Sequence, residues 1–223
     1  KAELNRYPDG SGHQLKKVLA NKLGVEPDQL TLGNGSNDVL DLITRVVMEP
    51  GFEAIIPKHS FVVYKLSVTC ANGEIVVAPA ASGFGADLEA VRDRISSKTR
   101  LIFIANPNNP TGTWVGLEEI EKLLLAVPKS VWVVIDEAYF EYLDHPQYGS
   151  ALCLMERFEN LIITRTFSKI YGLASLRLGY GITSSRFADL LNRARQPFNV
   201  GGLTLAAGVA ALSDDEFVIE SRQ

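Results

Sequence analysis

The segment TRTFSKIYG, residues 164–172, groups side chains that could do chemistry. The amine of Lys169 follows the hydroxyls of Thr166 and Ser168, and Arg177 comes a few residues later. Guanidinium and hydroxyl groups are donors that proteins use to bind phosphate, and a lysine amine in such a pocket can act as a nucleophile. The segment therefore favours a site that binds a phosphate and presents an amine. A solvated surface lysine is the alternative, which the neighbouring hydroxyls make less favoured.

The segment GNGSND, residues 33–38, could bind an anion. Gly33 and Gly35 permit a tight backbone turn, and Ser36 and Asn37 then offer backbone N–H groups at the start of a helix. A helix N-terminus contributes only about 0.3–1 kcal/mol toward an exposed anion, so other donors must share in holding a phosphate. The segment is neither a Walker loop nor a G-x-G-x-x-G fingerprint, and an ordinary glycine turn with a serine cap is an equal alternative.

Asp136 ends the most hydrophobic expected strand of the chain, VWVVID. A carboxylate buried there needs a cation, because an unpaired buried charge is costly. A protonated ring nitrogen would serve, and the pair would keep that ring electron-poor, so that it could accept electrons from a reacting carbon. A helix cap or an arginine partner is the alternative for an isolated aspartate.

The segment NPNNPTG, residues 106–112, follows the apolar run RLIFIA. Its prolines and glycine fix a loop that presents Asn109, whose side-chain amide can donate to a ring oxygen. By itself the segment is equally a rigid turn.

Apolar, β-branched segments alternate with longer segments of helical periodicity. This alternation predicts an α/β fold in which a mostly parallel, seven-stranded sheet carries helices on both faces. Ligands bind at the carboxyl ends of the strands of such sheets, so the polar segments would meet there. The short connection before residues 178–182 predicts that this last strand runs antiparallel. The expected strands are 29–32, 53–57, 74–78, 100–105, 131–136, 161–165 and 178–182, and the expected helices are 11–24, 36–48, 87–95, 117–127, 185–195, 203–213 and 214–223.

A formal charge of -4 and a pI near 5.5 argue against a nucleic-acid or anionic membrane surface, so small molecules are the expected partners. No apolar run approaches the roughly 18 residues of a membrane span, and no signal peptide opens the chain, so a cytoplasmic protein is expected. Cys70 and Cys153 are expected to be reduced, packed thiols. His13, His59 and His145 lack the spacing of metal ligands, so no metal site is predicted.

Taken together, these segments resemble the fold-type I pyridoxal-phosphate aminotransferases, and within them the histidinol-phosphate aminotransferases. The motifs stand in the family's order and approximate spacing over essentially all 223 residues. They are RYPDG, GNGSND, the segment around Phe61, NPNNPTG, VIDEAYFEY, RTFSKIYGLASLRLGY and QPFNV. The resemblance implies that pyridoxal 5'-phosphate is the cofactor.

The resemblance implies a role for each matching residue around the cofactor. Lys169 would hold the cofactor as a Schiff base, and Asp136 would pair with its pyridinium nitrogen. Asn109 and Tyr139 would hydrogen-bond the phenolic oxygen of the ring. Phe61 would stack on the ring, in a position where the family often has tyrosine. The residues implied to hold the phosphate are Ser36, Asn37, Thr166, Ser168 and Arg177.

The resemblance also implies contacts beyond the cofactor. Tyr7 of RYPDG would reach the phosphate of a neighbouring subunit, so a homodimer with active sites at its interface is expected. Asn199 of QPFNV would lie near the substrate. The chain has Gly201 and Gly202 where the family often has Asn and Ser, which leaves the local substrate contacts open.

The activity implied by the resemblance is transamination of histidinol phosphate with 2-oxoglutarate, in histidine biosynthesis. Lys169 would act first as nucleophile and then as general base, with Asp136 and Tyr139 in the same catalytic set. Residues 1–223 are expected to form only the large domain, because the family also has an N-terminal arm and a small C-terminal domain. The chain also begins without Met and stops inside an expected helix, as part of a longer polypeptide would.

Other functions stay open at this point. An aromatic aminotransferase and a threonine-phosphate decarboxylase share much of the scaffold, although RTFSKIYGLASLRLGY favours the histidinol-phosphate pattern. From a different class, the chain could be a non-catalytic domain that senses pyridoxal phosphate, or an inactive fragment. A plain nucleotide-binding domain is a third alternative, and GNGSND does not match its fingerprint.

Overall fold

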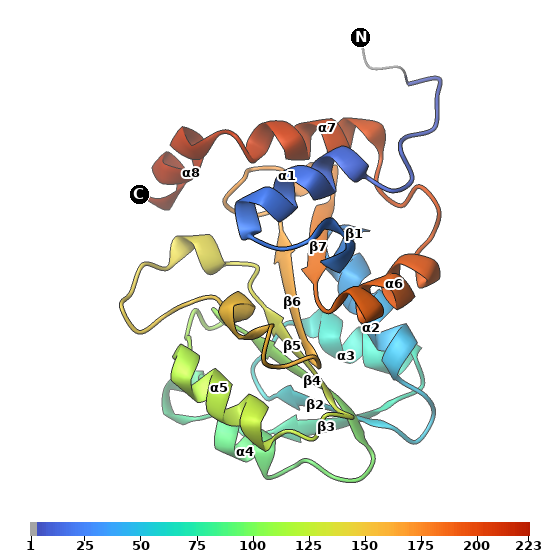
Figure 1. Ribbon diagram of the computed structural model, residues 1–223. Helices are drawn as coiled ribbons and strands as arrows, with labels where there is room; N and C mark the ends of the chain where they lie inside the picture. The colour runs from blue at the N-terminus through green and yellow to red at the C-terminus, as the bar shows by residue number, and fades with distance from the viewer. Residues whose placement is uncertain (1–3) are drawn as a thin grey trace.

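A seven-stranded sheet runs through the residues that the computed structural model describes, 4–223 (Figure 1). Its strands are β1 (Leu30–Asn34), β2 (Glu53–Pro57), β3 (Glu74–Ala78), β4 (Thr99–Ala105), β5 (Trp132–Asp136), β6 (Leu161–Thr166) and β7 (Leu178–Ile182). They lie in the order β1-β7-β6-β5-β4-β2-β3. The pairings among β2, β3, β4, β5 and β6 are parallel, and β7 is antiparallel to both β6 and β1. The predicted α/β fold with a mostly parallel sheet is confirmed, as is the reversal of the last strand.

Helices cover both faces of the sheet. They are α1 (His13–Leu23), α2 (Ser36–Val47), α3 (Val62–Cys70), α4 (Leu88–Arg92), α5 (Leu117–Ala126), α6 (Ser185–Ala194), α7 (Gly202–Ala211) and α8 (Asp215–Arg222), with short 3₁₀ turns η1 (Pro27–Gln29), η2 (Ser82–Phe84), η3 (Phe140–Tyr142), η4 (Ala151–Leu154) and η5 (Ala174–Leu176). Apolar residues of α1, α4 and α5 form one core cluster, and those of α2, α3 and α6 form the other. Figure 1 shows α4 and α5 on one side of the strands and α2 and α3 on the opposite side.

The central strands are buried on both faces. Every residue of β6 is buried, and in β5 only Trp132 is partly exposed. Parallel strands that helices cover on both faces have continuous apolar runs, which is why IFIA of β4 and VVI of β5 have no polar side. A polar side chain at the end of such a strand is therefore surrounded by protein, and it can reach solvent or a ligand only at the edge of the sheet.

Helix α3 departs from the sequence-based expectation, which places no helix at residues 62–70. Val62, Val63 and Thr69 are β-branched, and so short a segment does not show clear helical periodicity. The parallel pairing of β2 with β3 nevertheless requires a crossover, and these residues supply it as a helix that contacts α2. Tertiary packing here overrides the local preference of the residues.

Strand β1 extends further than expected, to Asn34. Gly33 pairs with Gly179 of β7 within this strand, so the prediction that Gly33 forms a turn is wrong. Gly35 forms the turn instead, and its φ of 80° lies in the region that glycine favours. Helix α2 starts directly after it at Ser36, as predicted.

The two cysteines lie at the surface. Cys70 and Cys153 are free, and both are exposed, so the expectation of packed thiols is wrong. Cys70 is the last residue of α3, where the helix has left the core, and Cys153 lies in the short turn η4. None of the helices formed by residues 4–223 combines the length and the apolar character that a membrane crossing requires.

A buried ion pair links the end of β5 to β6. Oε2 of Glu137 accepts hydrogen bonds from Nε and Nη2 of Arg165 at 3.0 and 2.7 Å, and the two side chains are 2% and 8% exposed. Oε1 of Glu137 accepts from the backbone N–H of Ala151 at 2.8 Å, and Arg165 lies 4.3 Å from the ring centroid of Phe140. The pair thereby anchors residues 140–151 beside the carboxyl end of β5.

Replacing Glu137 by Gln should lower the free energy of unfolding by about 3–5 kcal/mol, because Arg165 would stay buried without its hydrogen-bonded carboxylate. Urea unfolding of both proteins measures this difference. The matched control is Glu121→Gln, since Glu121 pairs with Arg157 where their side chains are 31% and 54% exposed. That change should cost less than about 1 kcal/mol. Equal effects of the two substitutions would contradict the argument.

Candidate active site

A pocket opens at the carboxyl ends of β4, β5 and β6. Its volume is about 170 Å³. The structure brings together here every residue predicted to bind the cofactor except Tyr7. The lining residues are Ser36, Asn37, Phe61, Ala105, Pro107, Asn109, Asp136, Ala138, Tyr139, Thr166, Ser168, Lys169 and Arg177.

Asp136 is buried at the inner side of this pocket, and both of its carboxylate oxygens accept hydrogen bonds. Oδ1 accepts from Oγ1 of Thr164 at 2.9 Å, and Oδ2 accepts from the hydroxyl of Tyr64 at 2.7 Å. The backbone N–H of Ala138 also donates to the carboxylate. An ionised carboxylate accepts about four hydrogen bonds, so these donors leave room for a further one from the pocket.

Burial raises the pKa of the Asp136 carboxyl, because water no longer stabilises its charge. Hydrogen bonds from Tyr64, Thr164 and Ala138 oppose the rise, and the charge of Glu137 adds to it. Burial also raises the pKa of Tyr64 well above its usual value, and the charge of Asp136 adds to that rise. The Tyr64 hydroxyl therefore stays protonated and donates, and a positive partner for Asp136 has to come from the pocket side.

Tyr64 and Thr164 are the residues of this site that the sequence analysis misses. Thr164 stands beside Asp136 in the register of β5 and β6, so aligning the two strands would have found it. Tyr64 lies in the unpredicted helix α3, and its surroundings follow only from the packing of that helix.

Lys169 is half-buried, and its amine lies against an aromatic face. Nζ is 4.9 Å from the ring centroid of Tyr139, a distance at which a cation is attracted to the ring. The backbone before it is fixed, because the N–H of Phe167 donates to the carbonyl oxygen of Leu178 at 2.9 Å. Lys169 and Tyr139 both line the pocket. A freely solvated lysine, the alternative weighed from the sequence, does not describe this arrangement.

The start of α2 and Arg177 form a cradle for an anion at one side of the pocket. A Cβ atom at Gly35 would collide with Nη2 of Arg177, and one at Gly179 would collide with the backbone N of Ser36. The two glycines therefore let the guanidinium and β7 approach the first N–H groups of the helix. Nη1 of Arg177 also donates to Oγ of Ser168 at 3.1 Å, which brings a hydroxyl to the same place. A guanidinium and a helix N-terminus together suit a phosphate.

Two buried asparagines brace the loop that presents Asn109. Nδ2 of Asn106 donates to the carbonyl oxygen of Val115 at 3.1 Å, and its Oδ1 accepts from the N–H of Val115 at 3.0 Å. Nδ2 of Asn108 donates to the carbonyl oxygen of His59 at 2.7 Å. The segment NPNNPTG is thus a rigid turn, which was one of the two alternatives from the sequence, and it also places Asn109 at the pocket.

Tyr7 and Asn199 are the predicted site residues that lie outside this pocket. Tyr7 is 83% exposed, and its ring stacks on Phe198 with the centroids 4.8 Å apart. Nδ2 of Asn199 donates to the carbonyl oxygen of Leu32 at 3.0 Å and to Oδ2 of Asp38 at 2.8 Å. Asn199 thereby ties the segment after α6 to β1 and α2. The roles of the two residues toward a partner subunit and a substrate stay predictions.

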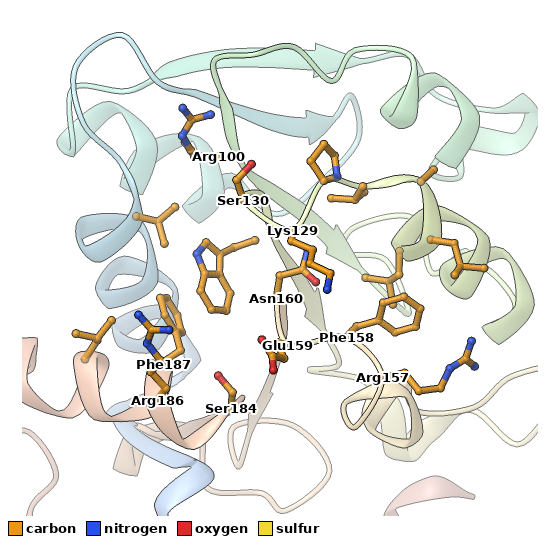
Figure 2. A pocket seen from close by; sticks show the side chains of 18 of the residues that line it. Arg100, Lys129, Ser130, Arg157, Phe158, Glu159, Asn160, Ser184, Arg186 and Phe187 are labelled. Carbon is orange, nitrogen blue, oxygen red and sulfur yellow. The ribbon is translucent and has the colours of Figure 1, made fainter.

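A larger cavity, of about 960 Å³, opens at the opposite edge of the sheet, where β4, β5 and β6 begin. Figure 2 shows its arginines, Arg100, Arg157 and Arg186, at separate sides of the hollow, so their charges do not converge on one ligand. In the part of the chain that the structure describes, no group of three or more His, Cys, Asp or Glu side chains could hold a metal ion. The pocket around Asp136 and Lys169 is therefore the stronger candidate.

The donor set of this pocket fits a flat ring with a protonated nitrogen at one end and an anionic group at the other. Asp136 can accept from the nitrogen, and Arg177 with the start of α2 can hold the anion. Phe61 offers an aromatic face, and Lys169 offers an amine. Such a site can bind a carbonyl compound covalently through the amine and move protons at the bound carbon.

Comparison with known proteins gives one consistent family. The model of the family "Aminotransferase class I and II" matches residues 1–223. Histidinol-phosphate aminotransferase 2 of Pseudomonas fluorescens Pf-5 is 50% identical over 222 residues, which are 100% of this chain and 60% of that protein. The protein of the same name from Methylococcus capsulatus is 53% identical over 217 residues, 95% of this chain and 58% of that protein.

A solved structure agrees with these relatives. Histidinol-phosphate aminotransferase from Sinorhizobium meliloti, in complex with pyridoxal-5'-phosphate, matches with a TM-score of 0.93 and 31% identity. The match covers 99% of this chain and 60% of that chain. The chain therefore spans about three fifths of the length of the proteins it matches.

Replacing Asp136 by Asn should change stability in a pH-dependent way. Because the folded-state pKa of Asp136 is raised above the unfolded value of about 3.9, its contribution to stability is fully present below that pH and is lost as pH rises through the folded pKa. Asn does not titrate. The difference in unfolding free energy, variant minus wild type, should therefore grow between pH 4 and pH 7 by about 1.4 kcal/mol for each unit by which the pKa is raised.

Urea unfolding at the two pH values, without ligand, measures this difference. The control is Asp41→Asn, which removes the exposed pair of Asp41 with Arg45 on α2 and should shift stability by at most about 0.5 kcal/mol at either pH. A difference for Asp136→Asn that is constant or falls with pH would show that the buried carboxylate carries no desolvation cost.

Proposed function

The chain belongs to the aminotransferase class I and II family, and from this premise we propose that residues 1–223 are the pyridoxal-phosphate-binding large domain of a histidinol-phosphate aminotransferase. The observation that carries the proposal is the meeting of Asp136, Lys169 and the anion cradle in one pocket. The choice of substrate rests on the 50% identity to proteins of that name along the whole chain.

The residues of the pocket fit pyridoxal phosphate group by group. Asp136 has an acceptor position left for the ring nitrogen, and the amine of Lys169 would hold the aldehyde carbon. Asn109 and Tyr139 would hydrogen-bond the ring oxygen, and Phe61 would stack on the ring. The residues that would hold the phosphate are Ser36, Asn37, Thr166, Ser168 and Arg177.

When bound, pyridoxal phosphate supplies an aldehyde that combines with amino groups and a ring that accepts electrons. The Nζ of Lys169 would be the nucleophile that holds the cofactor, and as a free amine it would be the general base for the proton on the α-carbon of the donor. Asp136 would keep the ring nitrogen protonated through a charge-assisted hydrogen bond. Tyr139 lies beside Nζ and limits where the amine can move.

The working protein is proposed to be a homodimer in which Tyr7 reaches the phosphate of the neighbouring subunit. The exposed ring of Tyr7 supports this, because its stacking on Phe198 holds it outside the pocket of its own chain. Val62 and Leu66 expose apolar side chains on one face of α3, next to the pocket residue Phe61. Exposed apolar groups at the border of a pocket suit a subunit interface.

The proposed reaction transfers the amino group of histidinol phosphate to 2-oxoglutarate, in histidine biosynthesis in the cytoplasm. Asn199 is proposed to act near the substrate through the segment that it ties to β1 and α2. Gly201 and Gly202, which open α7, would leave space in that region. An aromatic donor or threonine phosphate would demand different contacts in the same space, so a donor comparison can separate these functions.

Borohydride should fix pyridoxal phosphate covalently to Lys169 in the full-length protein. The reagent reduces the carbon–nitrogen bond between the cofactor and the amine, and peptide mass spectrometry then locates the modified lysine. The Lys169→Ala variant should lose the visible absorbance band and the covalent label. The matched control is Lys122→Ala, an exposed lysine of α5, which should keep both. Labelling of another lysine at wild-type yield in Lys169→Ala would overturn the assignment.

Histidinol phosphate should be the preferred amino donor of the full-length protein. We expect a kcat/KM at least about 10-fold above those for phenylalanine and threonine phosphate, because a site built for one polar side chain leaves its groups unpaired with another. Formation of glutamate from 2-oxoglutarate measures transamination with each donor. Release of carbon dioxide from threonine phosphate as the faster reaction would contradict the proposed substrate while leaving the cofactor site intact.

A further inference from the structure

Tyr64 is a wholly buried tyrosine whose hydroxyl hydrogen-bonds a charged group of the candidate site. Its hydroxyl donates to Oδ2 of Asp136 at 2.7 Å. A tyrosine that merely fills a core can satisfy its hydroxyl on any backbone carbonyl. Tyr148 does so, since its hydroxyl donates to the carbonyl oxygen of Asn106 at 3.0 Å. The choice of Asp136 as the partner of Tyr64 links this side chain to the reacting end of the pocket.

The position of Tyr64 is fixed by two other aromatic rings. Its ring stacks on Phe103 of β4, with the centroids 4.7 Å apart and the planes 4° from parallel. It meets the edge of Phe61 at 5.8 Å and 88°. Phe61 directly precedes α3 and Tyr64 lies in its first turn, so one helix start places both the aromatic face of the pocket and the donor to Asp136. Such packing leaves the Tyr64 hydroxyl little freedom to turn away.

The other donors to Asp136 come from other segments of the chain. Thr164 lies on β6, and the N–H of Ala138 belongs to the segment that follows Asp136 itself. Both would persist if Tyr64 lost its hydroxyl, but Oδ2 would then be buried without its side-chain donor. Leaving a buried charged acceptor unsatisfied costs more than the bond contributes when it is made.

We propose that Tyr64 is a positioning residue of the aminotransferase site, which holds the Asp136 carboxylate so that its remaining acceptor position faces the ring nitrogen of the cofactor. The inference rests on the proposed function. Tyr64 touches neither cofactor nor substrate, and it acts through Asp136. Tyr64 from α3 and the adjacent Glu137 act on the charge of Asp136, and the titratable or charged groups that line the pocket with it are Tyr139, Lys169 and Arg177.

The test is Tyr64→Phe in the full-length holoenzyme, which removes the hydroxyl and keeps the ring. The dissociation constant for pyridoxal phosphate should rise about 10-fold or more, as expected when a hydrogen bond to a charged group is lost. The absorbance band of the bound cofactor should also change at a higher pH than in the wild type. Without the Tyr64 hydroxyl the Asp136 carboxylate can turn away from the ring nitrogen, which then holds its proton less firmly. A less positive ring repels a proton on the Lys169 nitrogen less, so that proton leaves at a higher pH.

Tyr148→Phe is the matched control, because it loses a hydroxyl hydrogen bond without touching Asp136. It should lower the unfolding temperature while leaving the cofactor affinity and the pH of the absorbance change as in the wild type. If Tyr64→Phe behaves in the same way, Tyr64 is only a core residue and the proposal fails. A wild-type protein that binds no pyridoxal phosphate would instead defeat the proposed function itself.

A second variant keeps the test informative if Tyr64→Phe does not fold. Site-specific replacement of Tyr64 by fluorotyrosine keeps the shape of the side chain and makes its hydroxyl a stronger donor. The stronger hydrogen bond draws negative charge from the Asp136 carboxylate, so the ring nitrogen should hold its proton less firmly and the pH of the absorbance change should move up. No movement, in a protein that binds the cofactor with wild-type affinity, would overturn the positioning role.

Discussion

Burial of the Asp136 carboxylate is the constraint on which the rest of the site depends. The strand that it ends is covered on both faces, so water cannot stabilise its charge. Each neighbouring element instead contributes a donor: α3 gives Tyr64, β6 gives Thr164, and the chain after β5 gives the N–H of Ala138. These hydrogen-bond donors are neutral groups, so they do not cancel the negative charge of Asp136. The remaining attraction for a cation is what the site offers to a protonated ring nitrogen.

The anion cradle depends on backbone geometry at the other end of the pocket. Gly179 and Gly35 allow β7 and the guanidinium of Arg177 to approach the first turn of α2. Arg177 itself has a φ of 56°, in the left-handed region that non-glycine residues seldom adopt. Such a conformation costs on the order of 1 kcal/mol and persists where the surroundings impose it. Here it turns the side chain back toward Ser168 instead of along β7.

The sequence alone predicts those parts of the fold that follow from local pattern. Apolar runs mark the strands, and their carboxyl ends mark the place where Asp136 and Lys169 meet. The sequence does not predict the role of Tyr64, because the β-branched residues Val62 and Val63 disfavour the helix that contains it. Nor does it assign Gly33 correctly, since whether a glycine turns or continues a strand depends on the partner strand, here through Gly179. Contacts between distant segments decide both cases.

The two ends of the pocket differ in how firmly the protein holds them, and this difference follows from the fold. Asp136, Tyr64 and Thr164 are buried in the sheet and under α3, so the group proposed to control the electrons of the ring is held firmly. Arg177 and Asn37 are exposed, so the anion cradle is accessible from outside the subunit. In the proposed homodimer, Tyr7 of a second chain would add its contact at the phosphate without disturbing the core. Such an assembly would tune how tightly the cofactor is held, while the packing of a single subunit would set its reactivity.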